Sequence, residues 1–273
     1  MIMATVLMSA GALTACGGTD DAKAPAKTVS PTPAASAPAS TGAATSPPTD
    51  PGPLASGRLL LRWRMTGGFA GVGNPGSLPE FSLYGDGRAV AAGKNGGKPM
   101  EYRLKPDALA RLMNEAKAAG LDHSQTIGPE NIADAMILQI TMGDAKTRVI
   151  QPESQSTPIT QFWKKLEPAA WPKTDQAAPA RTYEPAKVAL LAGQTGGTEG
   201  ENTRPFTLVP LGRGEQASGG MCTVVSGDKA KEALKLSSAA KPTTQWRNEG
   251  KVYSLRFRPL LPDEKTCADV AVS

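Results

Sequence analysis

A 40-residue segment, residues 17–56, limits the fold because it can contribute almost nothing to a hydrophobic core. It contains 8 prolines, 10 alanines and 11 serines or threonines, and only Val29 and Leu54 are sizeable apolar side chains. Such a segment cannot bury enough surface to offset the entropy lost on ordering, so we predict that it is a disordered linker. All 13 aromatic residues follow it, which places the folded part of the chain at residues 57–273.

An apolar stretch precedes the linker. Residues 1–15 carry no charged side chain, and they are too few to span a membrane as a helix, which needs about 20 apolar residues. Their length suits the apolar core of a secretory signal peptide, which ends in small residues at its cleavage site. Residues 13–16, Leu-Thr-Ala-Cys, resemble the lipobox of bacterial lipoproteins. The resemblance implies cleavage between Ala15 and Cys16 and attachment of diacylglycerol to the Cys16 thiol.

This N-terminal stretch departs from the usual signal in one respect, because no Lys or Arg precedes its apolar core. We therefore expect the natural start to lie upstream of Met1. The alternative is a buried apolar strand or helix with an ordinary core cysteine at position 16, which the polar linker disfavours. Two acyl chains on Cys16 would give stable membrane anchoring. The linker would then hold the folded part off the outer face of the cytoplasmic membrane.

The charge of the folded part argues against nucleic-acid binding. Residues 57–273 contain 28 Lys and Arg against 22 Asp and Glu, and the longest basic run is Lys164-Lys165. Nucleic-acid binding requires a clustered basic stripe, which is absent here. A solvated surface of mixed charge is the simpler interpretation, and weak attraction to anionic envelope polymers or lipid headgroups is the alternative.

Two cysteines remain after Cys16, and they fit an exported protein. Cysteines outside the cytoplasm usually pair, so we predict a disulfide between Cys222 and Cys267. The loop would hold 46 residues, and the chain-entropy model gives a stabilisation of about 4 kcal/mol. Two buried free thiols are the alternative.

Hydrophobic periodicity predicts strands and helices in the first part of the folded region. Asp86-Gly87 and Gly143-Asp144 each separate two runs and predict hairpin turns, the first with positive φ at both residues. We expect Leu59, Leu61 and Trp63 to share one face of the first strand. The predicted strands are 58–66, 81–84, 88–90, 100–104, 135–142 and 147–150, and the predicted helices are 106–120, with an apolar stripe of Leu109, Leu112, Met113 and Ala116, and a second one that starts at Thr157 with a stripe of Ile159, Phe162, Trp163 and Leu166.

The polar, proline-marked residues 173–185 suggest a connector between two modules, 57–172 and 186–273. In the second module we predict strands at 187–192, 206–209, 222–225 and 252–257 and a helix at 228–239. The pattern indicates an α+β fold of antiparallel sheets, each covered on one face by a helix.

Several short motifs match known catalytic patterns by chance. Gly71 to Gly76 fits G-x-G-x-x-G, but a proline interrupts it and a strand follows, whereas a dinucleotide site needs a helix there. Ser226 to Lys229 and Ser238 to Lys241 fit S-x-x-K without the companion motifs of penicillin-recognising enzymes. We interpret Ser226 as a helix cap. His123 is the only histidine, and its position just after a helix indicates a favourable helix-dipole contact rather than catalysis or zinc binding.

Paired carboxylates could still perform acid–base chemistry, because spatial pairing is invisible in a sequence. None of the candidates stands out, and we assign no catalytic, cofactor-binding or metal-binding residue. The candidates are Glu80, Asp86, Glu101, Asp134, Asp263 and Glu264.

Two stretches together carry a family resemblance that covers most of residues 57–273. The chain resembles a group of uncharacterised secreted lipoproteins from high-GC Gram-positive bacteria, and its Ala, Gly, Pro and Arg bias fits such a genome. The resemblance implies export and a shared α+β fold, and it implies no activity. The stretches are residues 81–88, Phe-Ser-Leu-Tyr-Gly-Asp-Gly-Arg, and Trp246, Gly250 and Tyr253 with residues 258–264, Arg-Pro-Leu-Leu-Pro-Asp-Glu, before Cys267.

Two functional hypotheses follow. The first is a membrane-anchored, non-enzymatic binding module of the cell envelope, whose partner is an envelope protein or a cell-wall polymer. A shallow apolar or aromatic patch, including Trp246 or Tyr253, would favour it. The second is an envelope hydrolase or transferase built on carboxylates, which a cleft with two acidic side chains of raised pKa would favour.

The predicted disulfide can be tested by mass measurement. We expect the unreduced protein to contain no thiol that reacts with an alkylating reagent at Cys222 or Cys267, and both to react after reduction. Two alkylated cysteines in the unreduced, unfolded protein would contradict the pairing.

Overall fold

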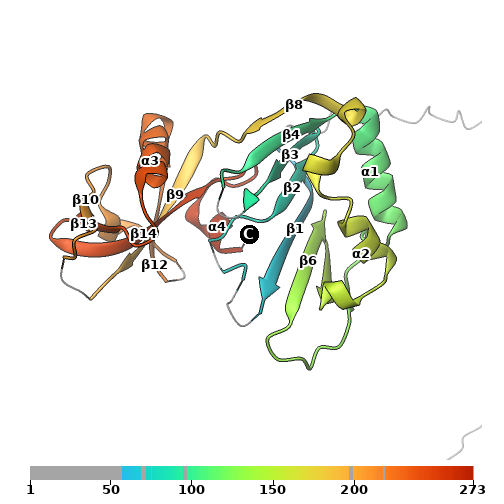
Figure 1. Ribbon diagram of the computed structural model, residues 1–273, viewed down its shortest axis with the longest axis horizontal. Coiled ribbons are helices and arrows are strands. Elements are labelled where there is room, and N and C mark those ends of the chain that lie inside the picture. The colour runs from blue at the N-terminus through green and yellow to red at the C-terminus, as the bar shows by residue number, and fades with distance from the viewer. Residues whose placement is uncertain are drawn as a thin grey trace, which may run out of the picture. The chain divides into compact units, whose positions relative to one another are not determined.

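The structure is a computed structural model, and it describes residues 57–68, 72–74, 76–94, 97–196, 199–217 and 219–272. The predicted signal peptide, Cys16 and the predicted linker lie outside these residues. The described residues belong to one compact unit. They form two mostly antiparallel sheets with four α-helices, which confirms the predicted α+β class (Figure 1).

The first sheet has eight strands in the order β5-β7-β6-β1-β2-β3-β4-β8. Neighbouring strands are antiparallel except for β5 and β7, which are parallel. The short β5, which the sequence did not predict, joins at the edge beyond β7. The strands are β1 (Leu59–Gly67), β2 (Phe81–Tyr84), β3 (Arg88–Ala91), β4 (Met100–Leu104), β5 (Gln125–Ile127), β6 (Met136–Met142), β7 (Ala145–Ile150) and β8 (Gln176–Thr182).

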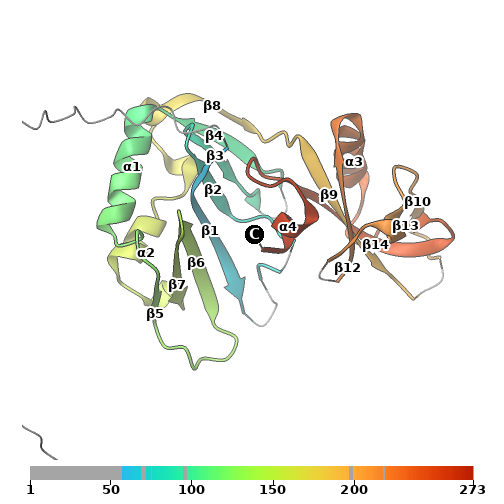
Figure 2. The ribbon, with the colours of Figure 1, turned by 180° about the vertical axis from the view of Figure 1, so that it is seen from behind.

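Two helices cover one face of this sheet, α1 (Pro106–Ala118) and α2 (Pro158–Trp163). Both views of the ribbon show them on the same side (Figures 1 and 2). Their apolar stripes and the inward residues of the strands form the largest core cluster. Members with almost no exposed surface are Leu61, Phe81, Leu83, Leu138, Ile140, Phe162 and Leu166.

A β-bulge corrects one prediction about β1. Leu61 pairs with Leu83, whereas Leu59 pairs with Tyr84, and the register shifts between the two leucines. The extra residue of a bulge places the side chains on its two sides on opposite faces of the sheet, out of the usual alternation. Leu59 therefore packs against Tyr84 on the other face of the sheet, while Leu61 and Trp63 face the helices.

Both predicted hairpins are present, but the first has another turn type. The Gly87 N–H donates to the Tyr84 carbonyl at 3.0 Å, and of the turn residues only Gly87 has positive φ, at 79°. The connection is therefore a three-residue loop with a left-handed glycine, and not a two-residue turn with positive φ at Asp86. In the second hairpin Gly143 alone has positive φ, which fits a turn with glycine at its first central position.

The residues at the N-termini of α1 and α2 confirm the predicted starts of these two helices. Lys105 precedes α1 and Pro106 occupies its first turn, where a missing N–H costs nothing. Thr157 caps α2 through a reciprocal capping box with Thr160. The helix α1 stops before Gly120, whose φ of 91° only glycine adopts readily.

The second sheet has six strands in the order β10-β13-β14-β9-β12-β11, with β10 and β13 parallel and the other pairs antiparallel. The predicted strands 187–192, 222–225 and 252–257 are confirmed as its three central strands. The elements are β9 (Lys187–Gln194), β10 (Thr203–Pro205), β11 (Glu215–Ala217), β12 (Gly220–Ser226), α3 (Gly227–Ala239), β13 (Gln245–Asn248), β14 (Lys251–Pro259) and α4 (Cys267–Val272).

The central strand β9 is apolar on both faces, because each face of the second sheet carries a helix. Val188 and Leu190 pack with α3 in one cluster, while Ala189 packs with Cys267 and Val270 of α4 in another. A helix on one face only was expected from the sequence. The six-residue α4 adds a second covered face here.

The predicted strand at 206–209 is wrong, and the side chain of Asn248 explains why. Asn248 donates to the carbonyls of Phe206 and Val209 at 2.8 and 3.1 Å and accepts from the Leu211 N–H at 2.8 Å. These bonds satisfy backbone groups that a strand would pair with a neighbouring strand. Phe206 is buried in the core without belonging to a strand.

Residues 173–185, expected as a connector, contain β8. This strand pairs with β4 at the edge of the first sheet, although its residues are almost all exposed. Its Ala, Pro and Arg residues carry no apolar periodicity, so the strand joins the sheet through backbone pairing and the Arg181–Glu101 ion pair.

Candidate functional site

A buried ion pair organises the C-terminal segment that follows β14. Both terminal guanidinium nitrogens of Arg258, Nη1 and Nη2, contact the carboxylate of Glu264, with Nη2 to Oε1 at 2.8 Å. The two side chains are 3% and 2% exposed. The Leu261 N–H donates to the same carboxylate at 2.7 Å. These contacts close residues 258–264 into a tight loop, which sends Leu260 into a cluster of the second sheet and Leu261 onto the first sheet.

A second ion pair fastens this loop to the first sheet. Arg62 donates to the Asp263 carboxylate at 2.8 and 3.1 Å, and the Tyr84 hydroxyl donates to it at 2.8 Å. Burial, followed by the Asp263 charge, raises the pKa of Tyr84. Burial lowers the pKa of Arg62, but its interactions with Asp263, Tyr84 and Glu264 together outweigh this effect and the net shift is upward. The Arg62 guanidinium therefore stays charged and paired with Asp263.

The other predicted carboxylates lie apart from this loop. Glu101 is buried and accepts from Arg181 at 2.7 Å, and Asp86 lies 3.6–3.7 Å from Arg103 and Arg88. Asp134 is exposed, with a positive φ of 55°. The candidates therefore do not gather into one acidic cleft.

Glu80 is a partly buried carboxylate that accepts from a backbone N–H. Its carboxylate accepts from the Met65 N–H at 3.1 Å. Burial raises its pKa above the ordinary value of 4.5, against the opposing effects of backbone hydrogen bonds and of Arg64. A single carboxyl group with raised pKa and no second carboxylate beside it gives no acid–base pair.

The other motif residues occupy surface or structural positions. His123 is exposed and contacts Asp122 at 3.1 Å. Ser226 stands at the N-cap of α3, but its side chain makes no capping hydrogen bond, contrary to the prediction. Ser238 donates to the Leu234 carbonyl within α3. Gly71 lies outside the described residues, and the segment after Gly76 leads to β2 and not to a helix.

Trp246 and Tyr253 do not form a surface patch. They face each other across β13 and β14 and are 2% and 3% exposed. Trp246 packs edge-to-face on Phe206 and Phe257, with ring centroids 5.6 and 5.8 Å apart. These aromatic residues belong to the core of the second sheet.

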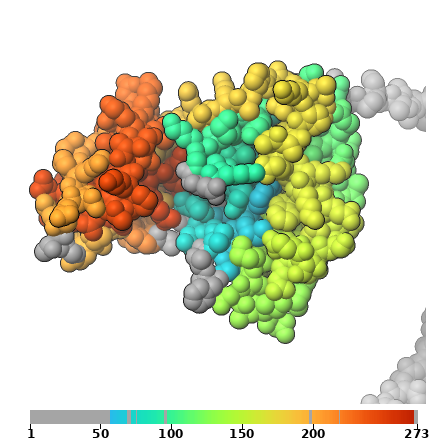
Figure 3. Space-filling view, in the orientation of Figure 1, coloured from blue at the N-terminus to red at the C-terminus, as the bar shows by residue number. Residues whose placement is uncertain are grey.

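The structure has a concave site to which the sequence did not point. This site, here called the Trp171 groove, lies between α1 and residues 164–175 and has a volume of about 330 Å³. In Figure 3 the yellow surface of residues 164–175 adjoins the green of α1. Leu104, Ala108, Leu112 and Trp171 form its apolar floor, which continues into the main core. A tryptophan inside a proline-rich, polar stretch was the sequence signal that could have indicated it.

Internal contacts hold the Trp171 ring in place. Its indole N–H donates to the Lys165 carbonyl at 2.9 Å. The ring meets Phe81 and Tyr102 edge-on, with centroids 5.9 and 6.2 Å apart. The half-buried ring therefore offers the groove an apolar face, because its polar atom is already used.

Two ion pairs cross the Trp171 groove from wall to wall. Arg111 of α1 lies 2.7 Å from Asp175, and Glu115 of α1 lies 2.6 Å from Lys165. All four side chains are at least 32% exposed, and such surface pairs contribute little stability. Lys164 is exposed at the rim, and its ammonium group has no ion pair with another described residue.

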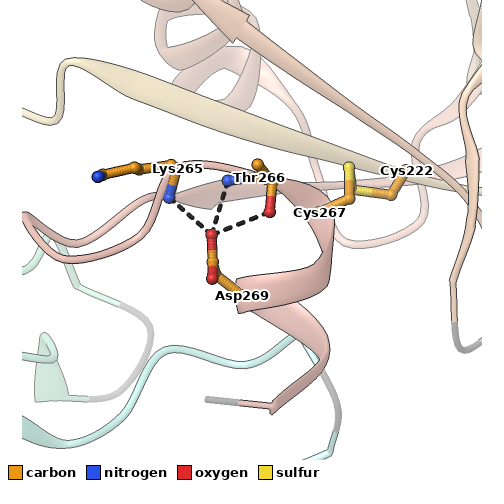
Figure 4. Close-up of a disulfide and its surroundings, with 5 residues drawn as sticks. All are labelled: Cys222, Lys265, Thr266, Cys267 and Asp269. Carbon is orange, nitrogen blue, oxygen red and sulfur yellow. Dashed lines mark hydrogen bonds between the residues drawn. A yellow bond between two sulfur atoms is a disulfide. The ribbon is translucent and has the colours of Figure 1, made fainter.

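The predicted disulfide is present and anchors α4 to β12. Cys222 and Cys267 are bonded, with Cα atoms 5.9 Å apart, and both are buried. Asp269 accepts from the N–H groups of Lys265 and Thr266 and from the Thr266 hydroxyl, at 2.8–2.9 Å (Figure 4). The backbone hydrogen bonds lower the pKa of Asp269. The disulfide and this cap together fix the C-terminal helix.

The described residues contain neither a helix that could span a membrane nor a three-residue metal site. No helix in that part of the chain has the length and apolar character that crossing a bilayer requires. Nor do the residues that the structure describes bring three metal-binding side chains of His, Cys, Asp or Glu together.

We predict that Glu264→Gln destabilises the fold by about 3–5 kcal/mol, because a buried guanidinium loses its counter-charge. Urea unfolding at neutral pH would measure this. Glu249→Gln is the matched control, since Glu249 pairs with Arg213 on the surface, and its cost should stay below about 1 kcal/mol. Equal effects of the two substitutions would contradict the structural role of the buried pair.

We predict a pH-dependent effect of Glu80→Gln. Because the pKa of Glu80 is raised in the folded protein, folding favours its protonated form, and stability is lost as the pH rises through the folded-state pKa. The neutral glutamine avoids this loss. The unfolding free energy of Glu80→Gln relative to the parent should therefore increase between pH 4 and pH 7, and a difference independent of pH would contradict the assignment.

Comparison of the chain with protein-family models, with curated proteins and with solved structures finds no match in any of the three.

Proposed function

We propose that this protein is an extracytoplasmic lipoprotein, anchored through lipidated Cys16 to the outer face of the cytoplasmic membrane, and that its folded part is a non-enzymatic binding module. The lipobox-like residues 13–16 and the polar residues 17–56 support the anchor and the spacer. The Cys222–Cys267 disulfide supports export, because disulfides persist outside the reducing cytoplasm.

Binding is favoured over catalysis because the carboxylates are held in structural ion pairs, whereas the groove is open to a ligand. Asp263 and Glu264 lie near each other, but each is held by an arginine in a structural role. A carboxylate pair for hydrolysis needs one group free to give or take a proton. The Trp171 groove instead has an apolar floor and a charged rim, as ligand sites commonly do.

The alternative, a carboxylate-based envelope hydrolase or transferase, would have to use Glu80 or the Asp263–Glu264 pair. Glu80 supports it only in part, because its raised pKa suits a proton donor but no second carboxylate lies beside it. Replacement of Asp263 would then abolish a turnover that the binding proposal does not require.

The anchor is tested by Cys16→Ser. In a bacterial host grown with labelled palmitate we expect the parent chain to be labelled and cleaved after Ala15, and the variant to be neither, because serine lacks the acceptor thiol. Continued labelling and cleavage of the variant would overturn the lipoprotein assignment.

A further inference from the structure

We infer that the Trp171 groove binds an amphipathic monoanion, with a hydrocarbon body against Trp171 and one carboxylate at the rim beside Lys164. This inference rests on the proposed function as a binding module, and it names the site and the ligand class of that module. The apolar floor of the groove, the hydrogen bonding of its backbone, the charge of its rim and its volume support this ligand class.

The floor of the groove selects for hydrocarbon. Leu104 and Ala108 are 5% and 6% exposed at its base, and Leu112 and the Trp171 ring complete it. The indole N–H of Trp171 donates to the Lys165 carbonyl, so the ring offers a ligand only its apolar surface. Burial of hydrocarbon there gains roughly 25 cal/mol for each Å² removed from water.

The backbone along the groove argues against a peptide or a sugar as the occupant. The carbonyls of Lys165, Trp171, Pro172 and Asp175 already accept hydrogen bonds from within the protein. The backbone N–H of Trp171 donates to the Pro168 carbonyl, and the backbone N–H of Asp175 donates to the Pro172 carbonyl. A ligand with polar groups along its body would lose water there without finding partners, which is costly. A ligand with one polar end avoids this cost.

The charges of the rim select for a single anion. Arg111, Lys164 and Lys165 face two carboxylates, Glu115 and Asp175, which leaves an excess of one positive charge. Each carboxylate is already paired across the groove, Glu115 with Lys165 and Asp175 with Arg111. The Lys164 ammonium therefore remains for a ligand carboxylate. The volume of about 330 Å³ is at the small end of ligand sites, which fits a medium-length chain.

Calorimetric titration with decanoate tests the inference. The full-length Cys16→Ser chain is the parent, because it carries no acyl chains of its own that could compete for the groove. We expect saturable binding of one decanoate per chain. Decanol and decylamine should bind about 2- to 5-fold more weakly, the effect of losing or reversing one exposed charge contact.

Two variants place the binding in the groove. Lys164→Glu should weaken decanoate binding about 2- to 5-fold. Lys146→Glu makes the same charge change at an exposed residue of β7 outside the groove and should leave the affinity unchanged. Ala170→Phe adds a ring at an exposed groove position and should abolish binding. Far-ultraviolet circular dichroism establishes that each variant is folded.

The outcomes separate this inference from the anchor proposal. Absence of decanoate binding, equal binding of decanol, or equal effects of Lys164→Glu and Lys146→Glu would overturn the groove assignment, whatever the result of palmitate labelling. Palmitate labelling that persists in Cys16→Ser would overturn the anchor and leave the groove assignment standing. Decanoate-selective binding lost in Ala170→Phe and weakened in Lys164→Glu supports the inference.

Discussion

The buried ion pair between Arg258 and Glu264 is the interaction on which the arrangement of the two sheets depends. It turns the chain at the end of β14 and satisfies the Leu261 N–H, so that Leu260 packs on the second sheet and Leu261 on the first. Two desolvated charges are favourable only when they are paired and hydrogen-bonded. The loop they define then presents Asp263 to Arg62 and Tyr84.

This geometry gives residues 258–264 a structural role. Residues 258–264 are not a catalytic motif but a structural joint, in which Arg258 and Glu264 close the loop and Asp263 fastens it. The disulfide works at the far end of the same segment, where Cys267 ties α4 to β12. Acidic residues that could suggest acid–base chemistry in the sequence are thus used to hold the C-terminal segment in place.

The Trp171 groove arises from a different requirement. The helix α1 and residues 164–175 both pack on the first sheet, and two exposed ion pairs connect their side chains above the core. The space left beneath has an apolar floor because it adjoins the main core, and a charged rim because the walls face water.

The sequence by itself determined the α+β class, both hairpins, α1 and α3, the start of α2 and the pairing of Cys222 with Cys267, because periodicity, turn residues and caps act over a few neighbours. It missed β5, β8, β10, β11, β13 and α4 and misplaced the strand at 206–209, since these depend on distant partners such as the Asn248 side chain. Leu59 changed faces through a bulge set by β2. Only the tertiary structure decided that Asp263 and Glu264 bind arginines and that Trp171 borders a groove, because contacts over long sequence separations leave no local pattern.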